Sequence, residues 1–391
     1  MDIPSIQNSP VGELVAITGT EPRTGDPYSH FAFVPDPLSN DLRLSMETIQ
    51  ALEEASRAIG ALGQACLALP NPQLLIQPAL YSEATATSAL EGTYGELNKV
   101  MESRLPGAGP GTPEIREINA YIDMAHYGFE WVREGRGITQ NFIFDLQKIL
   151  AQGSARPPAE PGQLRSGQVV IGPQGCLVRD ARFVPPPALS LRDGFAELVD
   201  WVQGNSQISP LLKIALTHYQ FETLHPFNDC NGRVGRLLII LEMLQHKLIS
   251  TPYLTISPWF LRRRDQYQDR LLNVSQTGDW NTWIGFFCEA VRDQSRAHVR
   301  VASELIDWQA DLSRKLFERK WSGVIGQVVE RLIEWPILTN KTVQDQFGVS
   351  SPTAKSVTDR LLEIGALDQI SDSNYGRVFG ATEVMKLVES L

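Results

Sequence analysis

Cysteine is scarce in this 391-residue chain, and the few cysteines lie far apart. They are Cys66, Cys176, Cys230 and Cys288, and no two of them form a CxxC pair. This spacing argues against a disulfide framework and indicates a reducing compartment. Long hydrophobic runs are also missing, because no apolar stretch reaches the ~18 residues of a membrane helix. The N-terminus lacks a basic segment followed by an apolar block. We therefore expect a cytoplasmic protein without a membrane partner.

Positive charge is in deficit as well. The chain has 35 Lys and Arg against 45 Asp and Glu, which gives a net charge of −10 and a predicted pI near 5.2. This balance argues against a nucleic-acid surface spread over the whole chain, although one local basic patch would still be compatible with it. The hydrophobic fraction of 42% suits a soluble globular protein, and the length predicts two or three domains.

Apolar residues recur at helical spacing along most of the chain, which predicts a mainly α fold. The expected helices span about 42–69, 81–104, 114–134, 137–152, 190–203, 208–224, 232–248, 260–275 and 279–320. Residues 1–42, rich in Pro, Ser and Gly, are expected to be irregular. Residues 168–187 hold two β-branched pieces around a Gly-Pro-Gln-Gly turn, which predicts a small β-hairpin. Three consecutive prolines prevent its second piece from being a central strand.

The last part of the chain, residues 323–391, has the pattern of a separate helix-turn-helix module. Residues 343–347 would form the first helix and Gly348 the turn. Ser350 or Ser351 would cap the second helix, with Pro352 in its first turn. The stretch from Ser371 to Val384 would then be a wing.

A helix-turn-helix predicts DNA binding, with Thr353 and Lys355 on the recognition helix. The charge of this module argues the other way. It contains six Lys and Arg against nine Asp and Glu, a net charge of −3. DNA affinity depends heavily on neutralising phosphates. A structural or protein-docking role is therefore favoured, and DNA binding stays open.

The stretch "LHPFNDCNGRVGRLLIILEML", residues 224–244, concentrates polar chemistry just before an apolar helical run. Gly232 lies at the start of that helix, where unpaired N–H groups and the helix dipole hold anions. Arg233 and Arg236 are three residues apart, hence on one face, and guanidinium groups bind phosphate in pairs of hydrogen bonds. Asp229 is a hard oxygen ligand suited to Mg²⁺, and His225 is suited to act as a base. Together they predict a phosphate site with a metal ligand and a base.

"HPFNDCNGRVGR" resembles the signature HPFxDGNGRxxR of the Fic family and differs from it at one position. Members of that family mostly transfer AMP from ATP to a protein hydroxyl and release pyrophosphate. The resemblance implies that His225 deprotonates the target hydroxyl, that Asp229 binds Mg²⁺, and that Phe227 packs the loop into the core. It further implies nucleotide contacts from Cys230, Asn231, Gly232, Arg233, Gly235 and Arg236, the backbone at Asn231 and Gly232 forming an anion hole.

Cys230 is the departure from the signature, which usually has glycine there. Its backbone N–H is kept, so the anion hole need not be lost. If the position requires a positive φ, cysteine costs on the order of 1–2 kcal/mol. The thiol precedes a helix N-terminus and lies near two arginines in sequence, features that lower a thiol pKa, whereas Asp229 acts in the opposite direction. A reactive, nucleotide-protected thiol and an inert one both remain open.

"TSALEG", residues 87–92, resembles the family's inhibitory motif [S/T]xxxE[G/N]. The resemblance implies autoinhibition, with Thr87 and Glu91 one helical turn apart and Glu91 bound to Arg236 in place of the γ-phosphate. A carboxylate is a fair substitute for a phosphate oxygen at a guanidinium group. A glutamate on a helix surface is the alternative.

The hairpin at 168–187 resembles the family's flap, and the resemblance implies that its exposed edge binds a target segment by strand addition. That edge consists of Gln168, Val169, Val170, Ile171 and Gly172. "SPWFLRRRDQYQDRLLNVSQTGDWNTWIGFF" resembles the same subgroup, where a tyrosine pair often touches adenine. Only Tyr267 of the pair is present, and both base stacking and core packing remain open for it. Arg262, Arg263 and Arg264 could form an electropositive rim or a solvated helix face.

The sequence therefore predicts three parts: an N-terminal helical region with the inhibitory motif at 1–113, a Fic catalytic domain at 114–320, and a winged helix-turn-helix-like module at 323–391. The leading hypothesis is a protein adenylyltransferase that uses ATP and Mg²⁺ on a protein target or on itself and forms a homodimer. One alternative is a DNA-binding regulator whose Fic body senses nucleotide. Another is removal of AMP by the same site, with Glu91 positioning a water.

Overall fold

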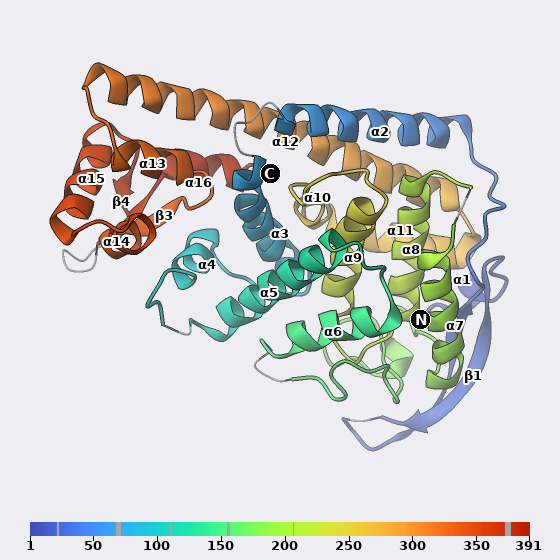
Figure 1. Cartoon of the computed structure of the whole chain (residues 1–391). Helices are drawn as coiled ribbons and strands as arrows, with labels where there is room; N and C mark the ends of the chain where they lie inside the picture. The colour runs from blue at the N-terminus through green and yellow to red at the C-terminus, as the bar shows by residue number, and fades with distance from the viewer. Residues whose placement is uncertain (22, 68–71, 110, 155–156, 206, 372–376) are drawn as a thin grey trace.

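The computed structural model describes residues 1–391 except 22, 68–71, 110, 155–156, 206 and 372–376. The chain is mainly helical, as its hydrophobic periodicity predicts (Figure 1). The longer helices of the body are α2 (Met46–Leu67), α3 (Ile76–Leu90), α5 (Pro113–Arg133), α6 (Gln140–Ala151), α7 (Ala188–Gln203), α8 (Pro210–Leu224), α9 (Asn231–Gln245), α11 (Arg264–Thr277) and α12 (Trp280–Glu318). Shorter pieces are α1 (Ile3–Ile6), α4 (Leu97–Ser103), α10 (Ser257–Arg262) and the 3-10 turns η1 (Pro72–Leu75) and η2 (Val178–Asp180).

Two expected helices are each divided in the structure. The stretch 81–104 consists of the end of α3 and of α4, because Gly92 has a φ of +89° and turns the chain between them. The stretch 260–275 consists of α10 and α11, with Arg263 at an extended φ of −130° between them. Glu91 consequently lies at the exposed end of α3, as its C-cap residue, rather than inside a long helix.

Helices α8 and α9 form the centre of the body. Every residue of α9 from Asn231 to Met243 is buried, which explains why this run shows no amphipathic pattern. Helix α8 packs against α7, α9 and α12, while α9 packs against α3, α5 and α6. Phe227, between the two helices, is fully buried among the rings of Phe144, Phe195 and Phe221. The junction between α8 and α9 is therefore held rigidly from several sides.

The longest helix, α12, lies beside α2 along one side of the molecule and then extends to the C-terminal module (Figure 1). Its hydrophobic face covers the body at one end and the module at the other. The buried hydrophobic cluster is continuous, because it includes Leu52 and Leu216 of the body together with Val357 and Val388 of the module. The division at about residue 320 stays a prediction.

The N-terminal residues are not irregular, contrary to expectation. They form an antiparallel hairpin of β1 (Gly12–Thr20) and β2 (Pro27–Pro35), in which Gly12 pairs with Pro35 and Thr20 with Pro27. The β-branched and aromatic residues of "ELVAIT" and "HFAFV" favour strands, and Gly25, with a φ of +76°, lies in the turn between them. The high Pro, Ser and Gly content of residues 1–42 predicted irregular structure, so these two nine-residue strands were not expected.

The flap, residues 168–187, has less regular strand pairing than a standard hairpin. Its two arms meet at one pair, Ile171 with Phe183, and η2 lies between them. Proline supplies no N–H to a ladder, so Pro173 and the prolines at 185–187 limit the pairing to this point. The flap also contacts the N-terminal hairpin, since Phe33 N donates to Val184 O at 2.9 Å.

The C-terminal module contains two helices joined by a tight turn and a small three-stranded sheet. Its elements are α13 (Val324–Arg331), β3 (Ile337–Thr339), α14 (Asn340–Phe347), α15 (Ser351–Glu363), β4 (Asp368–Gln369), β5 (Val378–Gly380) and α16 (Thr382–Glu389), and the antiparallel sheet has the order β3-β5-β4. Gly348 forms the turn at a φ of +62°, and the Ser350 side chain caps α15 by accepting from Thr353 N. Part of the expected wing, residues 372–376, lies outside the described residues.

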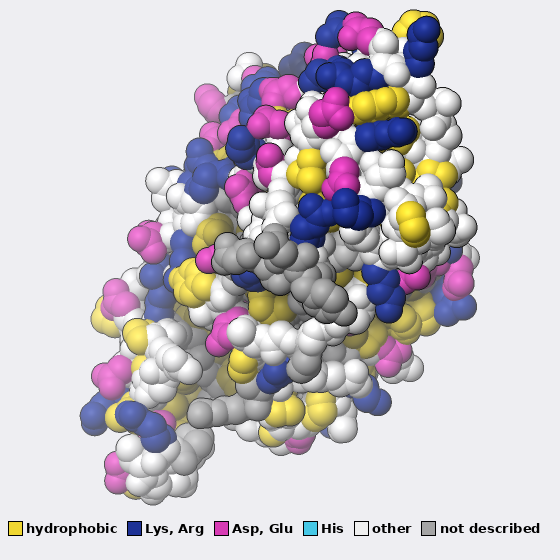
Figure 2. Space-filling model, turned by 90° about the vertical axis from the view of Figure 1, so that its left-hand side faces the viewer, with side chains coloured by type: hydrophobic (Ala, Val, Ile, Leu, Met, Phe, Trp, Pro, Cys, Tyr) yellow, Lys and Arg dark blue, Asp and Glu magenta, His cyan; other side chains and the backbone are white. Residues whose placement is uncertain are grey.

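The exposed charges of this module are mixed in sign. Lys355 on α15 pairs with Asp359 at 2.5 Å, and Arg377 pairs with the same carboxylate at 3.1 Å. Figure 2 shows Lys and Arg side chains interspersed with Asp and Glu over the face that it displays. No basic patch of the kind that neutralises a row of phosphates gathers on the described part of that face.

Candidate functional site

A cavity of about 700 Å³ lies where four elements meet. The end of α3, the flap, the junction between α8 and α9, and the inner face of α11 line it. His225, Asp229, Gly232 and Arg236 of the signature face this cavity, and so does Glu91. The structure thus gathers residues that are far apart in the sequence around one space large enough for a nucleotide.

His225 ends α8 in a left-handed conformation, with a φ of +47°. Its ring Nδ1 lies 3.3 Å from the carbonyl oxygen of Glu222. A carbonyl only accepts, so Nδ1 donates in this contact and Nε2 is left with a free lone pair. Burial, together with the nearby charge of Arg165, lowers the pKa of His225 to about 4. The ring is therefore neutral at physiological pH and able to accept a proton.

Cys230 precedes α9 at a φ of +76°, the left-handed conformation that favours glycine. Its thiol is buried, and Arg233 Nη2 lies 3.5 Å from the sulfur. Burial outweighs the charge of Arg233 and raises the pKa of the Cys230 thiol to about 12. Of the two alternatives for Cys230, the structure favours the inert thiol, because burial disfavours the thiolate more than Arg233 stabilises it.

This burial predicts a ranking of cysteine reactivity. Cys176 in the flap is half-buried, whereas the other three cysteines are buried and have raised thiol pKa values. We expect a small alkylating agent to label Cys176 first and Cys230 at least tenfold more slowly, because thiolate is the reactive form. Peptide mass spectrometry after timed labelling measures this. Labelling of Cys230 ahead of Cys176 would contradict the assignment.

Arg236 is buried on α9, and its Nη2 and Nε groups bind the end of α3. Its Nη2 donates to Glu91 Oε1 at 2.6 Å and to Thr87 O at 3.1 Å, and its Nε donates to Thr87 Oγ1 at 2.7 Å. A Cβ at Gly232 would lie 2.1 Å from Glu91 Oε1, so this glycine leaves the space that the carboxylate fills. Burial alone would raise the pKa of Glu91, but Arg236, with Arg233 and His225, outweighs it and lowers the pKa.

Other signature residues support the loop rather than the cavity. The Asn231 side chain bonds the backbone of Phe227 twice, with both distances at 2.8 Å. Arg233 donates to Glu117 at 3.4 Å. It is buried and is not one of the residues that line the cavity. Gly235 faces Phe221 and Glu222, since an added Cβ there would meet both. The anion-binding groups that remain are the N–H groups of the first turn of α9, where Cys230 makes no side-chain cap.

Asp229 is the candidate metal ligand, and its environment fits that role. Its Oδ1 accepts from Cys230 N at 2.6 Å, while the side chain is 54% exposed and lines the cavity. Across the described residues, no group of three or more His, Cys, Asp and Glu side chains could hold a metal by itself. Mg²⁺ often uses one protein carboxylate with substrate phosphates and water, so a single carboxylate is a suitable donor.

Tyr267 lines the cavity and is also packed into the core beside it. Its ring stacks on Phe260 with centroids 4.4 Å apart, and its hydroxyl lies 2.7 Å from His218 Nε2. The side chain is buried, which favours core packing over stacking on a base. Of the predicted docking edge, Ile171 and Gly172 line the cavity, whereas the cavity wall does not include Gln168, Val169 and Val170.

The arginine run 262–264 is not one rim. Arg264 lines the cavity, Arg263 lies over the Trp259 ring at 4.1 Å, and Arg262 bonds Gln294 and Leu391 O. The sequence also gave no reason to select Arg182, a cavity-lining flap residue paired with Asp269, or Glu222. Burial raises the pKa of Glu222 to about 7, and its Oε1 has no hydrogen-bond partner in the described structure.

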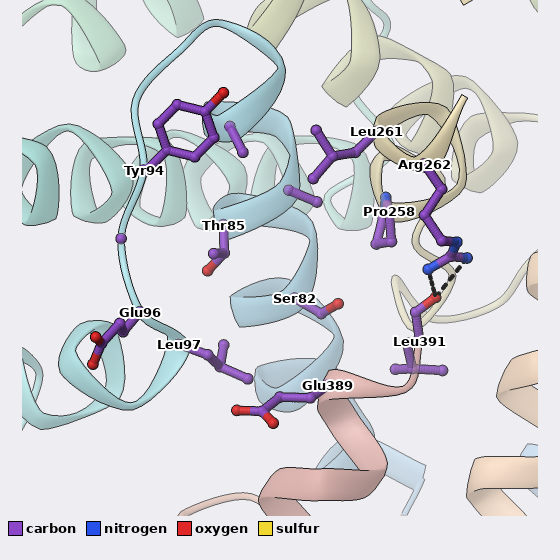
Figure 3. Close-up of a pocket in the computed structure, with 13 residues that line it drawn as sticks. Ser82, Thr85, Tyr94, Glu96, Leu97, Pro258, Leu261, Arg262, Glu389 and Leu391 are labelled. Atoms are coloured by element: carbon purple, nitrogen blue, oxygen red, sulfur yellow. Dashed lines mark hydrogen bonds between the residues drawn. The ribbon is translucent and has the colours of Figure 1, made fainter. Parts of the chain in front are cut away.

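A second cavity, of about 500 Å³, lies on a different face of α3 (Figure 3). Ser82 and Thr85 of α3, the segment around Tyr94, the end of α10 and Leu391 surround it. Both guanidinium Nη atoms of Arg262 donate to Leu391 O at 3.1 Å. It contains none of the signature residues, so the cavity at His225 is the candidate active site.

Comparison with known protein families supports this location. Residues 49–130 match the model of the Fic/DOC family N-terminal region, and residues 137–243 match that of the Fic/DOC family. The first match contains the inhibitory motif and the second contains the signature. Two solved structures with a similar fold are a Fic family protein from Desulfovibrio desulfuricans and Fic-1 from C. elegans. The first has a TM-score of 0.55 and 22% identity and covers 88% of this chain and 98% of its own. The second has a TM-score of 0.51 and 20% identity and covers 66% of this chain and 74% of its own.

Curated relatives are similar over part of their length. The chain is 33% identical over 169 residues to protein adenylyltransferase fic-1 of Caenorhabditis briggsae, covering 41% of this chain and 31% of the relative. It is 26% identical over 217 residues to protein adenylyltransferase Fic of Nematostella vectensis, covering 54% and 47%. A uridine 5'-monophosphate transferase of Xanthomonas campestris is 30% identical over 130 residues, covering 31% and 24%. Each match spans less than half of the relative's own length.

Proposed function

Because the chain belongs to the Fic/DOC family, we propose that it transfers AMP from ATP to a hydroxyl side chain of a protein target or of its own chain. The observation that supports this most is the position of a neutral His225 beside the uncapped first turn of α9 and the Arg236 guanidinium in one cavity. A base, an anion site and a buried cation are the groups that such a transfer requires. The relatives' names point to the same reaction.

In this mechanism His225 Nε2 accepts the proton of the target hydroxyl. The hydroxyl oxygen forms a bond to the α-phosphorus, the bond from that phosphorus to the oxygen bridging the β-phosphate breaks, and pyrophosphate leaves. The N–H groups of α9 and Arg236 stabilise the negative charge on the phosphate chain. Asp229 would hold Mg²⁺, which neutralises phosphate charge when bound.

We also propose that Glu91 inhibits this reaction in the state described here. Its carboxylate occupies Arg236 and lies against Gly232, where phosphate oxygens would otherwise bind. The flap would hold the target by main-chain hydrogen bonds along 168–172, placing its hydroxyl near His225. For the C-terminal module, the mixed exposed charges favour a structural or protein-docking role over DNA binding.

The identity of the nucleotide is tested by mass. The Glu91→Gly protein is incubated with Mg²⁺ and separately with ATP, GTP, CTP or UTP, and its intact mass is measured. We expect the mass of one or more AMP groups with ATP and much less modification with the others. A relative named as a uridine 5'-monophosphate transferase makes UTP the important comparison. Modification with UTP in preference to ATP, or none with any nucleotide, would overturn the AMP assignment.

The low pKa of His225 predicts an unusual pH dependence. A histidine with the ordinary pKa of about 6.5 would lose activity as a base below that pH. His225, with its pKa lowered to about 4, stays deprotonated as the pH falls from 8 to 5.5. We expect kcat/KM of the Glu91→Gly protein to change less than threefold over this range at saturating Mg²⁺. A tenfold fall centred near pH 6.5 would show that the histidine titrates normally.

A further inference from the structure

Arg165 is a buried cation with an unusual set of partners. Its side chain is 2% exposed, and within the described residues no carboxylate forms an ion pair with it. Its guanidinium group instead donates to four backbone carbonyl oxygens. Leaving a buried arginine without an acid is costly unless its hydrogen bonds are satisfied. The choice of carbonyls therefore shows what this residue is placed to hold.

Two of these carbonyls belong to the backbone at the catalytic histidine. Nε donates to His225 O at 2.9 Å and Nη2 to Leu224 O at 3.4 Å, and the backbone N of Arg165 donates to Pro226 O at 3.0 Å. His225 has a φ of +47°, a conformation that costs a non-glycine residue on the order of 1–2 kcal/mol. Bonds to three consecutive residues offset that cost and fix the direction of the ring.

The other two carbonyls lie at the two ends of the flap. Nη1 donates to Gly167 O at 2.9 Å, just before the first arm, and Nη2 donates to Pro186 O at 2.6 Å, at the end of the second arm. Among the described residues, the backbones of these arms pair only at Ile171 and Phe183, and Gln168 Nε2 adds one side-chain bond to Pro185 O, so few bonds of their own fix the flap. A single guanidinium group thus joins both ends of the flap to the backbone of the base.

We propose that Arg165 is a positioning residue for the transfer reaction, because it sets the flap that presents a target hydroxyl and the histidine that deprotonates it in one fixed relation. This proposal rests on the function proposed above. A positional error of about 1 Å between reacting groups can reduce a rate about 100-fold. The planar guanidinium fork reaches carbonyls in several directions at once, and a lysine ammonium group cannot reproduce that geometry.

The charge of Arg165 has a separate effect from its geometry. Next to burial, it is the main group that lowers the pKa of His225, while Glu91 and Asp229 raise it. Arg182, Arg236 and Arg264 are the other cations that line the cavity, and Glu222 is the remaining acid. Lysine at position 165 keeps the charge without the fork, and glutamine removes the charge. The two variants therefore separate positioning from electrostatics.

The test uses the full chain with Glu91→Gly as the parent, to which Arg165→Lys, Arg165→Gln or Arg179→Gln is added. Arg179 is a matched control, since it lies in the same flap with its side chain 76% exposed. Thermal unfolding reports folding, calorimetric titration with ATP and Mg²⁺ reports nucleotide affinity, and transfer of α-labelled phosphate reports turnover. We expect Arg165→Lys to keep ATP affinity within threefold and to lose turnover about 100-fold, with Arg179→Gln unchanged.

Titration of the histidine rings by NMR, with His225→Ala for assignment, measures the second effect without any need for activity. We expect the pKa of His225 to rise in Arg165→Gln and to remain near the parent's in Arg165→Lys. Turnover of Arg165→Lys within threefold of the parent would overturn the positioning role, and an unchanged His225 pKa in a folded Arg165→Gln would overturn the separate electrostatic effect. If Arg165→Gln does not fold, the turnover of Arg165→Lys decides. A parent that transfers nothing would instead refute the proposed function, and the titration would still test the contact.

Discussion

Replacing His225 with alanine should reduce AMP transfer by about 100- to 10,000-fold, the range that positioned proton transfer contributes. The ring is the neutral group in the cavity whose free nitrogen can accept the proton of a hydroxyl. Its side chain is not part of the hydrophobic core, so folding should be preserved. The proposed phosphate site consists of the first turn of α9 and Arg236 and does not include the His225 ring, so ATP affinity should change little. Transfer of label from α-labelled ATP, made in the Glu91→Gly background, measures the loss.

His30→Ala is a suitable control for this experiment. His30 lies on β2, and its ring Nδ1 lies 2.9 Å from the carbonyl oxygen of Phe31. We expect that variant to transfer at the parental rate. Equal activity of His225→Ala and the parent would remove His225 from the mechanism. A loss accompanied by an equal loss of folded protein in thermal unfolding would assign the effect to structure and not to proton transfer.

Replacing Glu91 with glycine should raise transfer by roughly tenfold or more, because it frees Arg236 and the first turn of α9 for phosphate. A contact between a carboxylate and a guanidinium group that must be broken before ATP binds reduces affinity tenfold for each 1.4 kcal/mol of its free energy. ATP should therefore bind more tightly to Glu91→Gly in calorimetric titration. Glu91→Gln, which keeps the shape but removes the charge, should lie between the two proteins. Wild-type affinity and rate in Glu91→Gly would show that the contact does not inhibit.

The same substitution should lower stability. Breaking a fully buried ion pair costs about 3–5 kcal/mol, but the Glu91 side chain is 37% exposed, so a loss of about 1–2 kcal/mol in the free energy of unfolding is expected. The lowered pKa of Glu91 means that this stabilisation is present above the ordinary carboxyl pKa and is lost as the pH falls through the lowered value. Urea unfolding at pH 7 and at pH 3.5 measures both. A protein that is more active and less stable at pH 7 is the combination expected of an inhibitory contact.

The order of residues 225–236 was informative because its chemistry is local. A base, a turn and a helix start follow each other within twelve residues, and the structure places His225, Asp229, Gly232 and Arg236 around one cavity. The strain cost expected for cysteine at a positive φ was also a local argument, and Cys230 does have a φ of +76°. The helix pattern likewise gave most of the body, because amphipathic spacing depends on neighbours in sequence.

What the sequence did not reveal depends on distant partners. Arg165 gives no local signal, since its partners at residues 186 and 224–226 are far along the chain. The raised pKa of the Cys230 thiol follows from burial, which the charges in the sequence alone did not show. The arms of the flap pair at a single point, because its β-branched residues favour extended chain whereas its prolines limit the hydrogen bonds between the arms. The two N-terminal strands were missed because Pro, Ser and Gly dominate the composition of residues 1–42.

In the proposed function, the protein transfers the AMP part of ATP at the His225 cavity, and Glu91 inhibits this reaction. This proposal is tested most directly by incubating the wild type, Glu91→Gly and Glu91→Gly/His225→Ala with Mg²⁺ and ATP labelled at either the α- or the γ-phosphorus. We expect the α-label to become attached to protein weakly in the wild type, strongly in Glu91→Gly and not in the double variant. All of the γ-label should be released as pyrophosphate. Attachment of γ-label, or α-label that is independent of His225, would contradict the proposal.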